Sequence, residues 1–439
     1  MNTFNSNCAP HHQSFISMLD AYAQRLLSDN SVEIRFPHAV RRLKREDIFE
    51  TPCPTRNDLR DLDCFTIDCD DTKDMDDAVS LVETGSGYQL GVHIADVAGY
   101  VQPHSALDCE AMQRGTSIYL PHMTIPMFPE MISNDICSLN PNVDRNTISV
   151  LIDLDADGNV LDSRITKSVI RSRIKGVYSE INSILTGNAA PSIRNKYACF
   201  TPTLHEMDAL SRKLRSIRAV NGANVENCQR ANVRLIGDTV DLVPCKHGAS
   251  ERIIEEFMVL ANRIVGEYFL AHALPTIFRA HEGSGKQAKY TTAADGHYGL
   301  QIDHYAHFTS PIRRLSDCRV HQVLTAHLAG CNNFCLHYMF DALLNESCDF
   351  ANRRSHRANQ IQKSCEAFCH EHYFNQRQSD TFSGVVTNYD HFGQPRIRLD
   401  DFDIDVIGST APILKVEQRV ILNVHAHNRK LYSRSVIAA

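Results

Sequence analysis

The sequence predicts an α+β protein in which a large body of mixed strands and helices is followed by a small β-barrel. The stretch "YQLGVHIADV" places Leu90, Val92 and Ile94 at alternate positions, which is typical of a half-buried strand. Residues 380–439 contain about five short strand patterns separated by turn residues, as in a small barrel of the OB type. The stretch "ERIIEEFMVLANRIVGEYFLAH" predicts a long helix with one buried stripe, made of Ile253, Phe257, Leu260, Ile264 and Tyr268.

The elements fall into three parts. Residues 1–60 carry a helical pattern near 12–28, followed by a polar, proline-containing connector that does not resemble a packed domain. Residues 61–375 form the body and residues 380–439 form the barrel. A chain of 439 residues with 43% hydrophobic content is long enough to bury a large core.

Composition and charge exclude several classes of protein. No basic leader with an apolar run opens the chain and no segment reaches 18 apolar residues, so we expect a cytoplasmic protein, monomeric by default. The 15 cysteines follow no disulfide-like spacing, which favours reduced thiols. A net charge of −7 argues against a surface coated in positive charge, so any nucleic-acid site must be local.

Three smaller clusters of basic or metal-ligating residues have ordinary structural explanations. One strand-like stretch places Arg171, Arg173 and Lys175 on one face, and a helical stretch groups Arg353, Arg354 and Arg357. Each basic cluster alone is more typical of a solvated face. The third cluster could bring zinc ligands together on a helix, but it lacks a paired CxxC motif, so we interpret it as buried thiols and histidines: Cys365, Cys369, His370 and His372.

The most informative stretch is "CFTIDCDDTKDMDDAVSL", residues 64–81, which crowds six aspartates into residues 68–77 between two apolar runs. Two carboxylates about 5 Å apart repel each other by roughly 3 kcal/mol at an effective dielectric near 20. A calcium loop of the EF-hand type is excluded, because counting from Asp68 puts Lys73 and Val79 where that loop needs Gly and Glu. Carboxylates gathered at a strand end favour a magnesium site over a solvated turn.

A second motif, "YAHFTSPIRRLSD" at residues 305–317, places Arg313 and Arg314 behind a Ser-Pro turn. An arginine fork can hold a phosphate group in two parallel hydrogen bonds, which positions it as well as attracting it. Carboxylates for a metal together with arginine for phosphate indicate phosphodiester chemistry.

With these motifs the chain resembles a known family. The stretches "TIDCDDTKDMDDAV", "GVHIADVAGYVQPHSALDCEAMQRGTSIYLP", "IPMFPEMISNDICSLNPNVDR", "IIEEFMVLAN" and "GHYGLQIDHYAHFTSPIRR" are similar to the catalytic RNB domain of the RNase II and RNase R exoribonucleases. They cover most of residues 58–325 in the family's order. The resemblance implies a hydrolase that takes single-stranded RNA, 3′ end first, into a buried magnesium or manganese site and releases nucleoside 5′-monophosphates.

The resemblance also assigns roles in the predicted metal site. Asp68 and Asp77 match the positions that contact the metal directly, and Asp74 and Asp76 would complete the metal and phosphate environment. Asp70, Asp71 and Asp96 also lie in family motifs, where we interpret them as supporting or structural residues.

Four further residues would bind the RNA. Tyr119 resembles an aromatic that stacks on the terminal base, worth about 1–3 kcal/mol, although it could instead be a core tyrosine. Glu255 matches a glutamate near the 3′ nucleotide, where a surface glutamate is the alternative, and Arg313 would hold the scissile phosphate, beside Arg314. Asn262 shares the helix face of Glu255.

The chain also departs from the family pattern. Its first 60 residues cannot hold the two cold-shock-type OB domains of longer members, and only "SGKQAKYTTAAD" follows Gly283 where the family has several dozen more residues. Glu226 and Asn227 stand where a second stacking aromatic is expected, and Gln362 stands where a late acid is expected. We therefore expect an intact catalytic site with altered binding of the RNA strand.

Three functions follow from this pattern: an active 3′-to-5′ exoribonuclease, a narrower hydrolase that trims short oligoribonucleotides or RNA 3′ tails, or a non-catalytic RNA-binding regulator. The third function would be expected to show lost aspartates, and all four are present.

Overall fold

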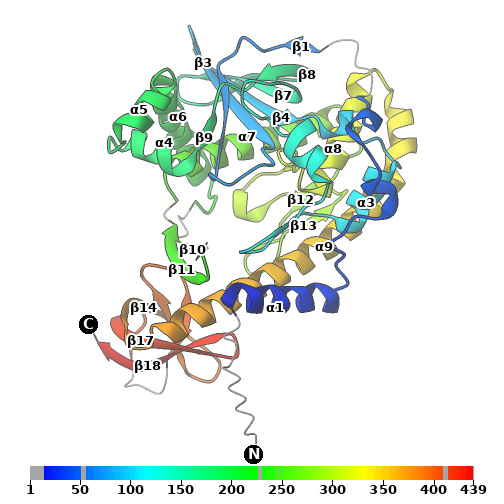
Figure 1. Ribbon diagram of the computed structural model, residues 1–439. Helices are drawn as coiled ribbons and strands as arrows, with labels where there is room; N and C mark the ends of the chain where they lie inside the picture. The colour runs from blue at the N-terminus through cyan, green and yellow to red at the C-terminus, as the bar shows by residue number, and fades with distance from the viewer. Residues whose placement is uncertain (1–13, 51–55, 226–229, 246, 409–413, 439) are drawn as a thin grey trace, which may run out of the picture.

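The computed structural model describes residues 14–50, 56–225, 230–245, 247–408 and 414–438. A body of sheet and helices lies above a small barrel in Figure 1, and one long helix, α9 (Asn333–Gln376), runs between them. This arrangement confirms the predicted α+β class.

A seven-stranded sheet is the centre of the body, in the order β1-β8-β7-β4-β3-β2-β9. Neighbouring strands are antiparallel except for the parallel pairs β1–β8 and β2–β9. The strands are β1 (Asn57–Asp58), β2 (Cys64–Asp68), β3 (Asp77–Thr84), β4 (Gly87–Ala95), β7 (Asp144–Asp155), β8 (Val160–Arg171) and β9 (Lys175–Val177).

The predicted strand around residue 90 is β4, but it is not half-buried. Leu90, Val92 and Ile94 lie in the main apolar core, and His93 between them is fully buried as well. The His93 ring bonds to the hydroxyls of Ser80 and Ser149 on the neighbouring strands. A central strand covered on both faces cannot keep a solvated side, so its second face is polar yet dry.

Helices cover both faces of the sheet. The main core packs the sheet against α4 (Tyr178–Leu185), α6 (Thr201–Val220) and α7 (Ala249–Ala271), with α5 (Pro191–Lys196) beside them. A second group contains α2 (His38–Arg41), α3 (Ala106–Arg114) and α8 (Leu315–Leu328). The stripe predicted for α7 is confirmed, because Ile253, Phe257, Leu260 and Ile264 are buried and Tyr268 packs against them.

The barrel is closed by five strands in the order β14-β15-β16-β18-β17. They are β14 (Thr381–Tyr389), β15 (Pro395–Leu399), β16 (Asp405–Ile407), β17 (Arg419–His427) and β18 (Lys430–Ala438). The first strand pairs with both the second and the fourth, which closes the sheet as in an OB barrel. The predicted five-stranded barrel is confirmed.

The helix α9 shares its side chains between two cores. Leu336, Phe340 and Leu344 near its start belong to the core of the body, whereas Ile361 and Phe374 near its end belong to the core of the barrel. Cys365 and Cys369 are buried in that second core, which agrees with their interpretation as buried thiols. The body and the barrel are thus joined by a continuous packed helix.

The N-terminal segment packs more fully than the sequence indicates. Helix α1 (Phe15–Asp29) lies along the end of α9, where the Phe15 ring stacks on His372. The connector that follows is anchored by Val40, which is buried against the body. It forms no core of its own, as the sequence predicts, but it contributes to the core of the body.

Short hairpins complete the fold. The hairpin β10 (Arg230–Ile236)–β11 (Thr239–Cys245) packs on α9, and β5 (Ile118–Tyr119) pairs with β6 (Thr124–Ile125). The short segment after Gly283 lies in a third hairpin, β12 (Phe278–Ala280)–β13 (Lys289–Thr291). None of the helices in the described ranges is both long and apolar enough to cross a membrane.

Candidate active site

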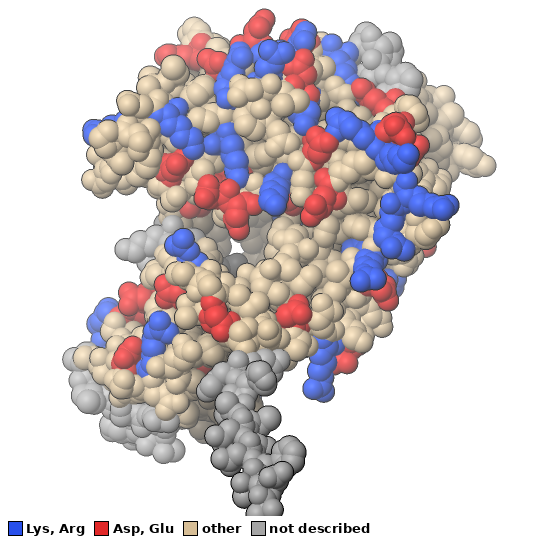
Figure 2. All heavy atoms as spheres, viewed as in Figure 1, with Lys and Arg blue, Asp and Glu red and all other residues tan. Residues whose placement is uncertain are grey.

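The aspartates gather at one edge of the sheet. Strand β2 ends at Asp68 and strand β3 begins at Asp77, and because the two strands are antiparallel neighbours these residues lie at the same edge. The connecting loop, residues 69–76, holds the remaining aspartates. Figure 2 shows acidic side chains gathered around the central hollow of this face of the molecule.

Two of the loop aspartates are held by named partners. Asp76 is 4% exposed, and its Oδ1 accepts a 2.7 Å hydrogen bond from the Ile312 amide. Its Oδ2 makes no hydrogen bond among the described residues but lies 3.4 Å from Nε of Arg313. The Asp74 carboxylate accepts a 2.7 Å hydrogen bond from the Tyr119 hydroxyl. The loop is thereby tied to two segments distant in sequence.

The two arginines at the start of α8 differ in their surroundings. The Arg313 side chain is 44% exposed and donates to the Ser310 hydroxyl at 2.8 Å. Arg314 instead pairs with the buried Asp317 at 2.6 Å. Asp317 also accepts from the Ser310 amide, so Arg314 helps to fix the turn that carries Arg313.

Glu255 and Asn262 lie on helix α7 as predicted, but their environments differ. Glu255 faces the guanidinium groups of Arg215 and Arg218 at 3.5 and 3.7 Å, and the His247 ring lies 3.4 Å away. Asn262 is buried and accepts from the Phe308 amide at 2.8 Å, so it fixes the segment that leads to Arg313.

Every residue that the sequence singled out for metal or substrate lines one cavity of about 410 Å³. These residues are Asp68, Asp74, Asp76, Asp77, Tyr119, Glu255, Arg313 and Arg314. They come from four separate segments, so their convergence is a property of the fold. Sequence reasoning missed Tyr178, Tyr305 and His307, which also line the cavity. The last two lie inside the motif at 305–317, whereas nothing in the sequence marked Tyr178.

Burial controls the charge of these carboxyl groups. Burial raises the pKa of Asp76 well above its usual range, although the Arg313 charge and the Ile312 amide oppose this shift. Burial also raises the pKa of Asp68, and the nearby Asp77 adds to the shift by repulsion. Burial raises the pKa of Asp77 against the opposing charge of Arg313. The cavity therefore favours any added positive charge.

No group of three or more His, Cys, Asp or Glu side chains among the described residues is arranged to hold a metal ion. This finding covers both the cysteine and histidine cluster of α9 and the aspartates. Mg²⁺ in proteins usually has only one or two carboxylate ligands and completes its shell with water and phosphate oxygens. Metal binding by the aspartates therefore stays a prediction of the sequence.

Comparison with models of known protein families identifies the family to which this chain belongs. The model of the RNB domain matches residues 56–287 and 284–330. The chain belongs to the RNB-domain family. The cavity lies within this match, and all the candidate residues fall in matched positions.

Curated relatives of this RNB chain are named Ribonuclease R. The protein from Thermotoga maritima is 34% identical, with 77% of this chain and 56% of that protein aligned. The protein from Chlamydia muridarum is 37% identical, with 62% of this chain and 46% of that protein aligned. The chain thus spans about half the length of the curated relatives that it matches.

Solved structures share the fold. RNase R of Mycoplasma genitalium, in complex with ribose-methylated single-stranded RNA, matches 96% of this chain and 78% of that one, with a TM-score of 0.81 and 21% identity. Yeast Ssd1, described as a pseudonuclease, matches 92% of this chain and 57% of that one, with a TM-score of 0.65 and 17% identity. The fold alone therefore does not decide activity.

The departures from the RNB pattern fall in different places. The two pieces of the family match overlap at residues 284–287, which lie in the loop that connects β12 to β13. Gln362 lies half-buried on α9. Glu226 and Asn227 lie outside the described residues.

Proposed function

We propose that this chain is a magnesium- or manganese-dependent 3′-to-5′ exoribonuclease that hydrolyses single-stranded RNA to nucleoside 5′-monophosphates. The observation that carries the proposal is the convergence of four aspartates, an exposed arginine and a half-exposed tyrosine in one cavity. Carboxylates that can hold a metal, together with a guanidinium that can hold a phosphate, are one combination of groups that can hydrolyse a phosphodiester. Membership of the RNB family and relatives named Ribonuclease R support it.

The donor set fits a hard divalent cation. Asp68, Asp74, Asp76 and Asp77 offer only carboxylate oxygens, the ligand type that Mg²⁺ and Mn²⁺ prefer. The raised pKa values of the buried carboxyls and the Asp76 oxygen without a hydrogen bond support a site that takes up positive charge. When bound, such a cation would lower the pKa of the attacking water and neutralise charge on the phosphate.

The side chains of the chain itself divide the remaining tasks. Arg313 would hold the scissile phosphate, because its guanidinium is exposed to the cavity and its position is fixed by Ser310 and Asp76. Tyr119 would stack on the terminal base, and its hydroxyl bond to Asp74 fixes the ring next to the phosphate site. Asp76 connects the acidic loop to the segment that carries Arg313, through its contacts with Ile312 and Arg313.

The second candidate is a hydrolase that prefers short oligoribonucleotides. The hairpin β12–β13 stands where the family resemblance predicts a longer, largely helical segment, so the RNA path has fewer contacts to offer beyond the cavity. Fewer contacts increase the off-rate of a long strand more than they affect the cleavage of a bound 3′ end.

One assay distinguishes these candidates. RNAs of several lengths, labelled at the 5′ end, are incubated with the chain in Mg²⁺, in Mn²⁺ and in excess EDTA, and the products are resolved as a ladder. An exoribonuclease gives a ladder of 3′-shortened products with either cation and none in EDTA. Efficient trimming of short RNAs alone supports the second candidate. No cleavage at any length supports the non-catalytic regulator and contradicts the proposal.

Cytoplasmic location and the monomeric state stay predictions of the sequence.

A further inference from the structure

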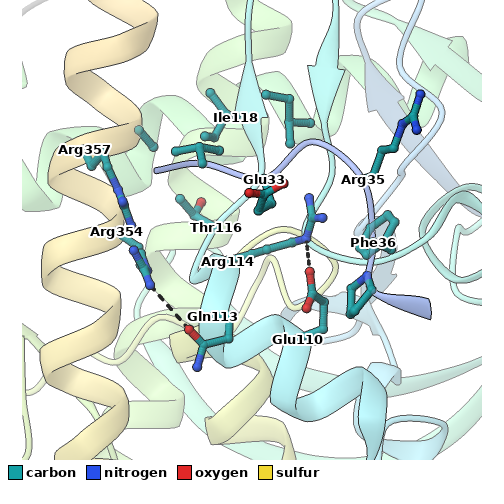
Figure 3. Close-up of a pocket in the computed structure, with 14 residues that line it drawn as sticks. Glu33, Arg35, Phe36, Glu110, Gln113, Arg114, Thr116, Ile118, Arg354 and Arg357 are labelled. Atoms are coloured by element: carbon teal, nitrogen blue, oxygen red, sulfur yellow. Dashed lines mark hydrogen bonds and ion pairs between the residues drawn. The ribbon is translucent and has the colours of Figure 1, made fainter. Parts of the chain in front are cut away.

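A second cavity of about 470 Å³ shares no lining residue with the acidic one. It lies between the N-terminal segment at residues 32–37, the end of α3, strand β5 and the middle of α9 (Figure 3). Thr116 and Ile118 form part of its wall, while the adjacent Tyr119 faces the acidic cavity. One short stretch of chain, residues 116–119, therefore contributes to the walls of both cavities.

Arginine dominates the charge of this pocket. Arg35, Arg114, Arg354 and Arg357 line it together with the carboxylates of Glu33 and Glu110. Arg114 pairs with Glu110 at 2.7 Å and also donates to two backbone carbonyls. In Figure 3 the Arg35 guanidinium points away from the other three arginines.

The two arginines of α9 have no acidic partner. Within the described ranges no carboxylate lies within ion-pair distance of Arg354 or Arg357. Arg357 donates to the Asn30 carbonyl, and Arg354 reaches Gln113 at 3.5 Å. The buried Nε of Arg354 makes no hydrogen bond to any residue that the structure describes. A partly buried guanidinium without a counter-charge is costly. Both side chains project from the same side of α9 into the pocket (Figure 3).

The backbone is shaped to bring Arg354 into place. Gly115 follows α3 with φ of +70°, and a Cβ at this position would lie 2.5 Å from Cβ of Arg354. Only glycine allows this close approach without displacing the arginine. Gly115 also accepts a backbone hydrogen bond from Leu315, so the same segment contacts the start of α8 beside Arg313 and Arg314.

The remaining wall is apolar. It contains Val32, Pro37, Ile118, Ile125, Ala358 and the Phe36 ring, over which the Arg114 guanidinium stacks at 3.9 Å. A ligand that fits must therefore carry an anionic group for the arginines and a flat, largely apolar group for this wall. A nucleotide has both, and its base edge can bond to Gln113 or Thr116.

We propose that this pocket binds a phosphate-bearing nucleotide, with the phosphate on Arg354 and Arg357 and the base against the apolar wall. The nucleotide is either one unit of a bound RNA strand or a free mononucleotide. Binding here does not rest on the proposed catalytic function, because it uses none of the residues of the acidic cavity.

The test measures binding without catalysis. The chain is titrated with adenosine 5′-monophosphate by calorimetry in excess EDTA, where cleavage stops, and Arg313→Gln, which removes the proposed phosphate-holding group of the acidic cavity, is titrated in parallel. We expect one binding site, and at least tenfold weaker binding of adenosine, which lacks the phosphate. The double variant Arg354→Gln/Arg357→Gln should weaken mononucleotide binding at least tenfold. Arg353→Gln, an exposed neighbour on the same helix that does not line the pocket, is the matched control and should not.

A variant that is expected to bind the mononucleotide more tightly provides a second test, because misfolding would weaken binding and could not strengthen it. Glu33→Gln removes the carboxylate that carries no ion pair among the described residues, so it should tighten binding of adenosine 5′-monophosphate several-fold. A decamer of adenylate, measured in the same EDTA buffer, separates the two sources. Displacement of the decamer by mononucleotide, with weaker decamer binding in the double variant, supports an RNA strand as the source, whereas an unchanged decamer affinity supports a free mononucleotide. Absent mononucleotide binding, or equal losses in the double variant and in Arg353→Gln, would overturn the proposal.

Discussion

The interiors of the body and of the barrel differ in what they bury. The body encloses many charged or titratable side chains, among them Asp76, His93, Asp96, Lys167, Asp317, Arg319 and His321. Among the described barrel residues, Ser433 is the only fully buried polar side chain, and the core is built from residues such as Val386, Ile397 and Leu422. The barrel needs only packing for its fold, whereas the body also holds charges in fixed positions.

The buried charges of the body form ion pairs, and one of these pairs supports the cavity. Asp317 pairs with Arg314 and accepts from Ser310, which fixes the turn before Arg313. Asp96 pairs with Arg56 and with Lys167 at 2.8 Å or less. Burying ions costs free energy unless they are paired, so these pairs reduce the stability cost of an ionic interior.

The sharpest test of the body is Asp76→Asn. Asparagine keeps the shape and can still accept from the Ile312 amide, but it cannot ionise opposite Arg313 or offer a carboxylate oxygen to a cation. We expect cleavage of RNA to fall about 1,000-fold or more, while binding of single-stranded RNA, which depends on many phosphate and stacking contacts, stays within about threefold. Single-turnover cleavage and filter binding measure the two effects.

The control for this variant is Asp70→Asn, an exposed aspartate of the same loop that does not line the cavity. Its cleavage rate should stay close to that of the unmodified chain. If Asp76→Asn keeps even a tenth of the normal rate, the assignment of the acidic cavity as the catalytic site is wrong.

The second test concerns stability. Arg319 is fully buried, pairs with Asp108 and donates to Ser347 at 2.9 Å. Arg319→Met leaves Asp108 buried without its cation, so we expect the free energy of unfolding to fall by about 3–5 kcal/mol. The matched change in the barrel, Arg398→Met, removes a half-exposed partner of Asp405 and should cost about 1 kcal/mol or less. Urea unfolding of both variants measures the difference, and similar losses would mean that the two interiors are alike.

The aspartate cluster could be predicted from the sequence because its information is local. Two apolar runs of strand character flank the acids, so the carboxylates had to lie at strand ends. The role of Arg314 could not be inferred in this way, because its partner Asp317 lies on the helix that follows and only the fold shows that both are buried. Similarly, alternation marked β4 as a strand, yet alternation cannot show whether the second face meets water or the hydroxyls of Ser80 and Ser149.

The second cavity, which Arg354 and Arg357 line, shows the same limit of prediction from sequence alone. The sequence grouped Arg353, Arg354 and Arg357 as one solvated helical face. The structure separates them, because Arg354 and Arg357 line the pocket while Arg353 is exposed. Arg354 and Arg357 differ from Arg353 because Gly115 and the N-terminal segment lie against their side of α9. Both segments are more than 200 residues away from α9 in the sequence, so a local pattern cannot reveal this contact.

The third test concerns the surface of the barrel. Phe392 is 77% exposed in the turn between β14 and β15, which corresponds to one of the loops with which OB barrels bind nucleic acid. Phe392→Ala should weaken binding of a 20-nucleotide RNA by about 5- to 150-fold, the loss of one stacked base, without changing cleavage of a trinucleotide. Fluorescence anisotropy measures the binding.

Phe334→Ala provides the control, because this side chain is 81% exposed at the other end of α9. Equal effects on the long and the short RNA would show that the barrel acts through the fold instead of through contact. A point variant is preferable to removal of residues 380–439, because that deletion would expose Phe374 and Ile361 of α9.

The smallest expected effect is the response of the body to acid, through His93. Burial lowers the pKa of His93 to about 4, compared with about 6.5 in an unfolded chain. Between these two values the unfolded chain binds a proton that the folded chain does not, so stability is complete above pH 6.5 and falls as the pH decreases toward 4. The slope from one such proton is about 1.4 kcal/mol per pH unit.

His93→Asn should be less stable than the unmodified chain at pH 7.5, but its stability should decline less steeply with acid. His427→Asn, at an exposed position in the barrel, should leave the decline unchanged. Urea unfolding at pH 7.5, 6.0 and 5.0 provides the three curves, and because the other buried histidines of the body remain in every variant, only a difference in slope reports on His93. Parallel curves for the chain and for His93→Asn would show that this histidine takes up its proton without unfolding the body, and that the polar face of the sheet is not as dry as its burial indicates.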